Sequence, residues 1–223
     1  MSMAAGASHP QPRALRLAVD IGGTFTDVAA FDEATGRLAL GKWSSTPRDL
    51  VEGILRAIAE AGADLASANL LLHGSTVVVN AILQRRGART ALITTRGFRD
   101  VYEIGRINRP ESFNLFFRKH VPLVPRSLRF EVTERLDAEG EVLVPLDEAE
   151  AEAVARRLVE LGIESVAVVF LHAYRNPAHE LRMRDVLARV APDLFVTLSH
   201  ELSREYREYE RTSTTAANAF VGP

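Results

Sequence analysis

Short apolar runs of strand length recur along the chain, with turn residues between them. Between the later runs, apolar residues return every three or four positions, which is the spacing of an amphipathic helix. These patterns predict strands over residues 15–21, 28–31, 37–45, 70–72, 90–95, 130–136, 141–144, 165–171 and 195–198. They predict helices from Thr46 past Ile58, over 77–86, from Asp147 to Gly162, over 176–190 and over 205–220.

Two of the predicted helices carry clear start signals. Thr46 is expected to cap the first, with Pro47 at its first helical position and Asp49 in its first turn. Asp147 is expected to cap a later helix, and Glu150 follows it at the spacing of a capping box.

The order of the elements predicts an α/β fold. A meander of three strands is followed by strands that alternate with helices, which indicates a mixed β-sheet flanked by helices. The strand at 165–171 is apolar at every position after the first, as expected for a sheet covered on both faces. Residues 97–125 break the periodicity, which is typical of a long functional excursion. We expect a disordered leader over 1–14 and one domain over 15–223, with a possible internal boundary near Val144.

Composition narrows the class of protein. Of the 223 residues, 47% are apolar and 25% are charged, as in ordinary folded proteins. A formal net charge of -2 provides no basic field for nucleic acid, and the lack of cysteine excludes disulfides, thiolate nucleophiles and cysteine-ligated zinc. No apolar stretch approaches the roughly 20 residues of a membrane helix, and residues 1–12 lack a secretory signal pattern. We therefore expect a cytoplasmic protein without nucleic-acid or membrane partners.

The turn that follows the first strand carries the most specific chemistry. Gly22 and Gly23 let the backbone turn sharply and let a phosphate approach main-chain amides without an intervening Cβ. Thr24 and Thr26 add hydroxyl groups, and Asp20 lies where a carboxylate can hold Mg²⁺ through water. These groups together suit a nucleoside triphosphate.

A plain hairpin is the alternative interpretation of this turn, because paired glycines are common turn signals. The Walker A and dinucleotide-binding patterns are both absent, since the turn has no lysine and no helix follows its glycines. The sequence therefore excludes a P-loop or a Rossmann site at this position.

The segment Asp-Ile-Gly-Gly-Thr-Phe-Thr-Asp at 20–27 resembles the first phosphate motif of the actin and sugar-kinase ATPase superfamily, and specifically that of hydantoinase A, 5-oxoprolinase and acetone carboxylase subunits. Further segments resemble that family in the expected order. They are His-Gly-Ser-Thr-Val-Val-Val-Asn-Ala at 73–81, Gly-Phe-Arg-Asp-Val at 97–101, Glu-Ile-Gly-Arg at 103–106, Asn-Pro-Ala-His-Glu at 176–180 and Glu-Tyr-Glu-Arg at 208–211. The resemblance implies a ribonuclease H-like, actin-like ATPase lobe.

The resemblance also implies a function. We expect the N-terminal lobe of an ATP-dependent amidohydrolase, which opens a hydantoin, 5-oxoproline or a similar cyclic amide by phosphorylating its carbonyl oxygen. An ATP-dependent ketone carboxylase subunit and a non-catalytic interaction module are the alternatives. The second lobe of such an ATPase is expected to be missing from this sequence, and a hydantoinase B-like chain is an expected partner.

The expected cofactors are ATP and Mg²⁺. Asp20 and His73 are the expected catalytic residues, and Asp20 is also the expected metal ligand. The phosphate is expected to contact Gly22, Gly23, Thr24, Thr26 and Asp27.

Several other polar residues are candidates for substrate binding. They are Gly74, Ser75, Thr76, Asn80, Arg106 and Arg109. The first three lie where a strand is expected to give way to a helix, and the positive end of a helix can bind an anion. A plain N-cap is the alternative for Ser75 or Thr76, and surface exposure is the alternative for the two arginines.

Two further pairs have weaker claims to function. Asp100 and Glu103 are candidates for a base or a metal ligand, although ordinary ion pairs with nearby arginines are the more common outcome. His172 and His179 are seven residues apart, not at the four-residue helical spacing of a metal pair, which favours structural roles.

Overall fold

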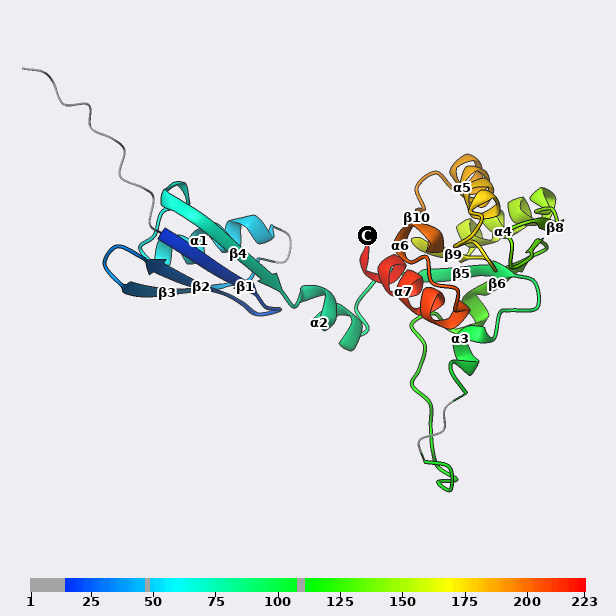
Figure 1. Ribbon diagram of the computed structural model, residues 1–223, viewed down its shortest axis with the longest axis horizontal. Helices are drawn as coiled ribbons and strands as arrows, with labels where there is room; N and C mark the ends of the chain where they lie inside the picture. Colours follow the sequence, from blue (N-terminus) through cyan, green and yellow to red (C-terminus); the bar gives the residue numbers. More distant parts are fainter. Residues whose placement is uncertain (1–14, 47–48, 108–110) are drawn as a thin grey trace, which may run out of the picture. The chain divides into compact units, whose positions relative to one another are not determined.

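The computed structural model describes residues 15–46, 49–107 and 111–223. The chain divides into two compact units, one ending at Asn80 and the other beginning at Ala81 (Figure 1). The possible boundary near Val144 falls inside the second unit, where Val144 ends a short hairpin strand. The expected leader over 1–14 lies outside the described residues.

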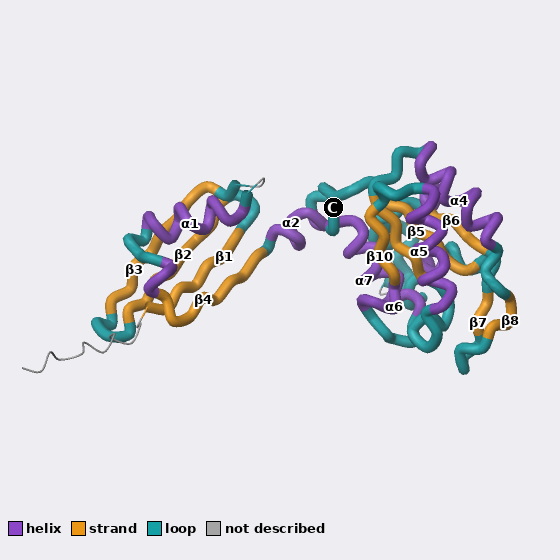
Figure 2. The backbone as a smooth tube through the Cα atoms, turned by 90° about the horizontal axis from the view of Figure 1, so that it is seen from above, coloured by secondary structure: helices purple, strands orange, loops and turns teal. Residues whose placement is uncertain are grey.

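The first unit is a four-stranded sheet with one long helix on one face (Figure 2). Its strands are β1 (Leu15–Ile21), β2 (Phe25–Asp32), β3 (Arg37–Ser44) and β4 (Ala68–Ser75), in the order β3-β2-β1-β4. β1 pairs antiparallel with β2 and parallel with β4. Leu17, Val19 and Ile21 alternate toward the covered face and form its core with Val28 and Ile58.

The helix on that face is α1 (Leu50–Glu60), and it begins later than the sequence predicted. Asp49 is its N-cap, because the Asp49 side chain accepts a hydrogen bond from the Glu52 amide. The prediction of Thr46 as the cap is wrong. The Thr46 hydroxyl instead accepts a hydrogen bond from the Gly53 amide at 3.0 Å. This bond joins the segment that precedes α1 to the first turn of the helix. Pro47 lies outside the described residues.

The second unit is built on a parallel sheet in the order β10-β9-β5-β6. Its strands are β5 (Thr90–Thr95), β6 (Arg129–Val132), β9 (Ser165–Val169) and β10 (Phe195–Leu198). Helices cover both faces, as the continuous apolar run of β9 predicts. Ile93 and Val168 face a core that includes α4 (Glu148–Glu160) and α5 (Ala178–Val190), whereas Leu92 and Val169 face a second core that includes α7 (Glu208–Val221).

The remaining elements of this unit frame the sheet. They are α3 (Val101–Ile104), the 3-10 turn η2 (Arg126–Leu128), α4 (Glu148–Glu160), α5 (Ala178–Val190), α6 (Ser199–Leu202) and α7 (Glu208–Val221), with a hairpin of β7 (Arg135–Leu136) and β8 (Val142–Val144). Asp147 caps α4 as predicted, by accepting the Glu150 amide. The predicted helix at 205–220 begins only at Glu208, and α6 precedes it. Residues 111–121 project from this unit between α3 and η2 (Figure 1).

The α/β class with helices flanking the sheets is confirmed, and the described strands form a mixed four-stranded sheet, a parallel four-stranded sheet and the two-stranded sheet of β7 and β8. Helix α2 (Val77–Leu83) contains the boundary between the units. Among the described residues, no helix combines the length and apolar character needed to cross a membrane.

A buried carboxylate fastens the second unit together. Glu180 of α5 is fully buried and accepts hydrogen bonds from the Phe170 amide, the Ser199 hydroxyl and the His200 amide. Its Oε2 also lies 2.7 Å from His200 Nδ1. One side chain therefore links the segment after β9 to α5 and α6, and satisfied partners are what make such a buried charge tolerable.

Close packing of α1 on the first sheet depends on Gly41. A Cβ at this position would lie 2.1 Å from the Ala57 carbonyl oxygen and 2.7 Å from the Ala61 amide nitrogen. We predict that Gly41→Ala lowers the free energy of unfolding of the first unit by about 2–3 kcal/mol, because the helix backbone must move away. The measurement is urea unfolding followed by the fluorescence of Trp43, the only tryptophan in the chain. Leu38→Ala, on the exposed face of the same strand, is the control and is expected to cost less than about 1 kcal/mol.

Candidate functional site

The candidate site is built on the tight turn between β1 and β2. The Gly22 amide donates to the Phe25 carbonyl at 2.9 Å, which closes the turn. A Cβ on Gly22 would lie 3.0 Å from that same oxygen, so glycine lets the turn close. Within the described residues, the amides of Gly23 and Thr24 donate to no protein acceptor. Two main-chain donors are therefore available to a ligand.

The pairing register places two carboxylates opposite each other at the end of the sheet. Asp20 of β1 is paired with Asp27 of β2 on one side and with Gly74 of β4 on the other. Directly opposite residues hold their Cβ atoms about 5 Å apart on the same face, where like charges repel each other. A cation relieves such repulsion, and the structure supplies one for Asp27 only.

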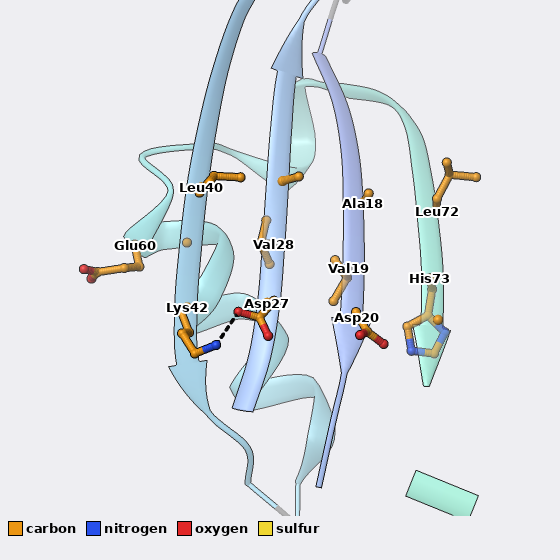
Figure 3. Close-up of a pocket in the computed structure, with 13 residues that line it drawn as sticks. Ala18, Val19, Asp20, Asp27, Val28, Leu40, Lys42, Glu60, Leu72 and His73 are labelled. Carbon is orange, nitrogen blue, oxygen red and sulfur yellow. Dashed lines mark hydrogen bonds and ion pairs between the residues drawn. The ribbon is translucent and has the colours of Figure 1, made fainter. Parts of the chain in front are cut away.

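That cation is Lys42 of β3. Its Nζ lies 2.8 Å from Asp27 Oδ1 and 4.8 Å from the centre of the Phe25 ring. Asp20 has no hydrogen-bond or ion-pair partner in the described part of the chain. Figure 3 shows the Asp27 carboxylate directed at Lys42 and the Asp20 carboxylate turned toward β4, where His73 lies. Asp20 is therefore the free acidic group of the site.

A pocket of about 820 Å³ opens beside these groups. Its lining includes Asp20, Asp27, Lys42, His73 and Gly74, together with an apolar floor of Ala18, Ala29, Leu40 and Leu72. Gly74 leaves the neighbourhood of Asp20 open, because a Cβ there would lie 3.7 Å from Asp20 Oδ1. The structure thus brings together four of the residues predicted from the sequence, and it adds Lys42.

The residues after Gly74 support the turn. Ser75 ends β4 just before α2 (Val77–Leu83), where the sequence predicted a strand giving way to a helix, and its hydroxyl accepts the Val77 amide at 3.3 Å in the manner of a cap. The Thr76 amide donates to the Ile21 carbonyl at 3.0 Å. Asn80 lies near the turn: its Nδ2 donates to Thr76 Oγ1 at 3.3 Å, and a Cβ on Gly23 would lie 3.1 Å from the same nitrogen. Gly74, Ser75 and Thr76 therefore precede the first turn of α2, a helix of seven residues.

The two threonines of the turn have different surroundings. Thr26 is 1% exposed, and its hydroxyl lies 3.3 Å from Ser45 Oγ. Ser45 donates its own hydroxyl hydrogen to the Gly22 carbonyl at 2.8 Å, so Thr26 donates to Ser45. Thr24 is exposed and its hydroxyl has no partner among the described residues. The buried Thr26 hydroxyl therefore stabilises the turn through Ser45, while Thr24 faces solvent.

The other sequence candidates do not line this pocket. Arg106 belongs to the second unit, where its Nε donates to Glu210 Oε1 at 2.6 Å, and Arg109 lies outside the described residues. Asp100 and Glu103 form ion pairs, as expected. The Arg126 guanidinium binds Asp100 through two hydrogen bonds, which hold the pKa of that carboxyl below its usual value.

The two histidines differ in their surroundings. His179 is buried, with Nδ1 2.7 Å from Glu134 Oε2, so its position fits the predicted structural role. His172 lies beside a groove of the second unit and is considered below.

Lys42 is the residue of the site that the sequence interpretation missed. The alternation of β3 carried the signal, because Leu38, Leu40 and Lys42 share one face of that strand. The short turn between β2 and β3 fixes which residues of the two strands lie opposite each other. Counting outward from that turn pairs Lys42 with Asp27.

The donor set fits a weakly held hard cation with its own water shell. No cluster of three or more histidine, aspartate or glutamate side chains suited to a metal occurs in residues 15–46, 49–107 and 111–223. Mg²⁺ needs few protein carboxylates because it retains several waters. Asp20 with two free amides nearby is consistent with a metal that a phosphate also ligates.

The architecture defines the class to which the chain belongs: an α/β protein similar to ATP-dependent carboxylases and amidases. It superposes with a TM-score of 0.81 on a nucleotide-free structure of acetone carboxylase, an enzyme of ATP-dependent acetone carboxylation. The identity is 30%, and the match covers 94% of this chain and 32% of that one. The alpha subunit of caprolactamase from Pseudomonas jessenii is 36% identical over 219 residues, which are 93% of this chain and 31% of that subunit.

Residues 16–191 match the family described as the hydantoinase/oxoprolinase N-terminal region. The chain belongs to this family. An uncharacterized protein of Methanocaldococcus jannaschii is 41% identical over 211 residues, which are 93% of this chain and 31% of that protein. The chain thus spans about a third of the length of each of these relatives.

The different roles of the two threonines can be tested with matched substitutions. We predict that Thr26→Val lowers the stability of the first unit by about 1 kcal/mol, because the hydroxyl that braces Ser45 is lost. Thr24→Val is expected to change stability by less than about 0.5 kcal/mol, because the side chain is exposed and unpaired. Urea unfolding monitored at Trp43 measures both. An equal loss of stability in both variants would contradict the assignment.

Proposed function

We propose that the turn at 20–27 binds the phosphates of ATP with Mg²⁺, and that the chain is the N-terminal lobe of an ATP-dependent amidohydrolase acting on a cyclic amide. The observation that carries the proposal is the free carboxylate of Asp20 beside two unpaired amides, those of Gly23 and Thr24. The family and its ATP-dependent members support the nucleotide. The name of caprolactamase supports a lactam-type substrate.

Each residue of the turn has a role in this proposal. The amides of Gly23 and Thr24 donate to phosphate oxygens, and the glycines keep side chains out of the approach. Asp20 holds the waters of Mg²⁺, whose charge stabilises the transferring phosphoryl group. Lys42 neutralises Asp27, so Asp20 is the carboxylate of the opposed pair whose charge Mg²⁺ would offset near the phosphates. Thr24 supplies a hydroxyl donor, whereas Thr26 acts through Ser45 to hold the turn.

The polar groups on β4 face the reacting end of the ligand in this proposal. ATP would supply the phosphoryl group that the amide oxygen accepts as ADP leaves, which would make the carbonyl carbon a better electrophile for water, so that hydrolysis releases phosphate and breaks the C–N bond of the ring. His73 lines the pocket beside Asp20 and is positioned to hold or move a proton there. Gly74 leaves the space that the substrate or phosphate occupies. Asn80, whose Nδ2 donates to Thr76 Oγ1, lies near the glycine turn.

A carboxylase is the second candidate function, and the similarity to acetone carboxylase favours it. The same turn would then deliver phosphate to a ketone or to bicarbonate.

A non-catalytic module, which keeps the fold without turnover, is the third candidate. In either enzymatic interpretation, the complete protein acts in the cytoplasm with a second ATPase lobe and a hydantoinase B-like partner. The name of the caprolactamase relative, an alpha subunit, and that of a similar acetophenone carboxylase chain, a gamma subunit, support such a partner.

The most direct functional test uses the full-length protein and its partner. We predict that ATP hydrolysis depends on an added lactam, hydantoin or 5-oxoproline, and that Asp20→Asn reduces the coupled rate by about 100-fold or more. Asp193→Asn, an exposed carboxylate of the second unit, is the control and is expected to leave the rate unchanged. Stimulation by a ketone with bicarbonate, and by no amide, would select the carboxylase. Failure to bind Mg-ATP would select the non-catalytic module.

For the 223-residue chain by itself we predict little or no ATP turnover. The chain spans about a third of each of the relatives named above, and phosphoryl transfer requires charge stabilisation on all sides of the transferring group. Phosphate release from the purified chain, measured with Mg²⁺ and ATP, tests this expectation. Robust turnover that Asp20→Asn abolishes would show that the chain is a complete catalyst.

A further inference from the structure

A groove of about 440 Å³ lies in the second unit, where three segments that are distant in sequence meet. They are the residue that follows α3, the loop after β9 and the segment that leads into α7. The groove is lined by Arg106, Tyr174, Arg204, Glu205, Tyr206, Arg207 and Glu210. Three arginines face two glutamates, so the lining carries a net charge of +1. The volume is that of a site for a small molecule.

The arginines of the groove are not equivalent. Arg106 is neutralised by Glu210, with its Nε 2.6 Å from Glu210 Oε1. Burial opposes ionisation of Glu210, but its own backbone amide and Arg106 outweigh that effect and hold its pKa below the usual value. Arg204 has no hydrogen-bond or ion-pair partner in the described chain, and Arg207 contacts only Tyr206, with its Nε 3.1 Å from the phenol oxygen. Two guanidinium groups are therefore free to bind an oxyanion.

The wall behind these arginines contains buried polar groups without partners. The Arg211 guanidinium lies 5.5 Å from the centre of the Tyr174 ring and is fully buried. Arg211 donates from one nitrogen to the Phe170 carbonyl at 2.8 Å, but its Nε and Nη1 have no partner. His172 contacts the same tyrosine ring, and its buried Nδ1 is also unpaired. Unsatisfied buried donors are costly, so their clustering around Tyr174 calls for a functional reason.

The backbone on two sides of the groove is strained as well. His172, two residues before Tyr174, has a φ of 55°, and Ile107, directly after Arg106, has a φ of 60°. A β-branched residue rarely adopts this left-handed conformation. Strain of this kind persists where the surrounding structure fixes the backbone, and here the strained residues lie next to Arg106 and two residues before Tyr174, both of which line the groove.

We propose that this groove binds the oxyanion of a small molecule, a carboxylate or a phosphate, through Arg204 and Arg207, with the flat body of the ligand against Tyr174 and Tyr206. The guanidinium fork matches two oxygens of either anion, and the tyrosine rings offer apolar faces. Arg211 adds a fixed positive charge behind Tyr174. This site uses none of the residues of the turn at 20–27, so it does not rest on the proposed use of ATP.

The test measures binding of a fluorinated probe to the purified chain by ¹⁹F NMR. 4-Fluorobenzoate is expected to bind, and 4-fluorobenzyl alcohol, its neutral counterpart, is expected to bind at least about tenfold more weakly. The double variant R204Q/R207Q is expected to weaken 4-fluorobenzoate binding by at least about tenfold. Both side chains are exposed and hold no structural contact beyond Tyr206, so the variant is expected to fold as the parent does.

R156Q/R157Q is the matched control, because it removes the same charge from exposed arginines of α4. Competition with inorganic phosphate and phenyl phosphate identifies the anion: stronger displacement by phosphates than by benzoate assigns a phosphate ligand, and the reverse assigns a carboxylate. The proposal is overturned if the chain does not bind any of the anions, if the neutral alcohol binds as tightly as 4-fluorobenzoate, or if the control variant loses as much affinity as R204Q/R207Q.

Discussion

The hydrogen-bond register of β1 is the constraint on which the candidate site depends. β1 lies between an antiparallel and a parallel partner, and burial of Leu17, Val19 and Ile21 under α1 fixes which face each residue takes. A slip of one residue would turn Asp20 into the core and Val19 into solvent. Because the register is fixed, Asp20 is held opposite Asp27 and beside Gly74 without any contact from its own carboxylate. The charge of Asp20 therefore remains available at the end of the strand.

The turn itself is held from outside its own residues. Ser45, just after β3, binds the Gly22 carbonyl through its hydroxyl and the Thr24 carbonyl through its amide, while the Thr76 amide holds Ile21. These contacts use carbonyl groups and leave the amides of Gly23 and Thr24 free. Donors that are fixed before a ligand arrives lose little freedom on binding, which is the property required for stabilising developing charge. In the second unit, the side chain of buried Glu180 likewise fixes backbone segments through hydrogen bonds, here the loops after β9 and around α6.

Much of this architecture follows from local patterns, and the features that the sequence did not predict have separate physical causes. The strands, the α/β class and the Asp147 cap follow from alternation and short-range chemistry, and the glycine turn is visible directly. Thr46 was misassigned as a cap because two competing oxygens, those of Thr46 and Asp49, lie within one turn of each other. Thr24 and Thr26 differ because Thr26 lies in β2 and faces the covered side of the sheet, whereas Thr24 precedes the strand in the turn, where strand alternation does not apply. The groove at Arg106, Tyr174 and Arg207 joins segments far apart in sequence, so a single sequence carries no signal for it.

The measurement that tests the account most directly is a structure of the full-length protein with Mg²⁺ and a non-hydrolysable ATP analogue. The account predicts phosphate oxygens about 3 Å from the amides of Gly23 and Thr24, with a metal-bound water on the Asp20 carboxylate. Thr26 is expected to keep its contact with Ser45 and to touch no phosphate. A nucleotide bound elsewhere, with the turn at 20–27 unoccupied, would contradict the assignment of this turn as the phosphate site.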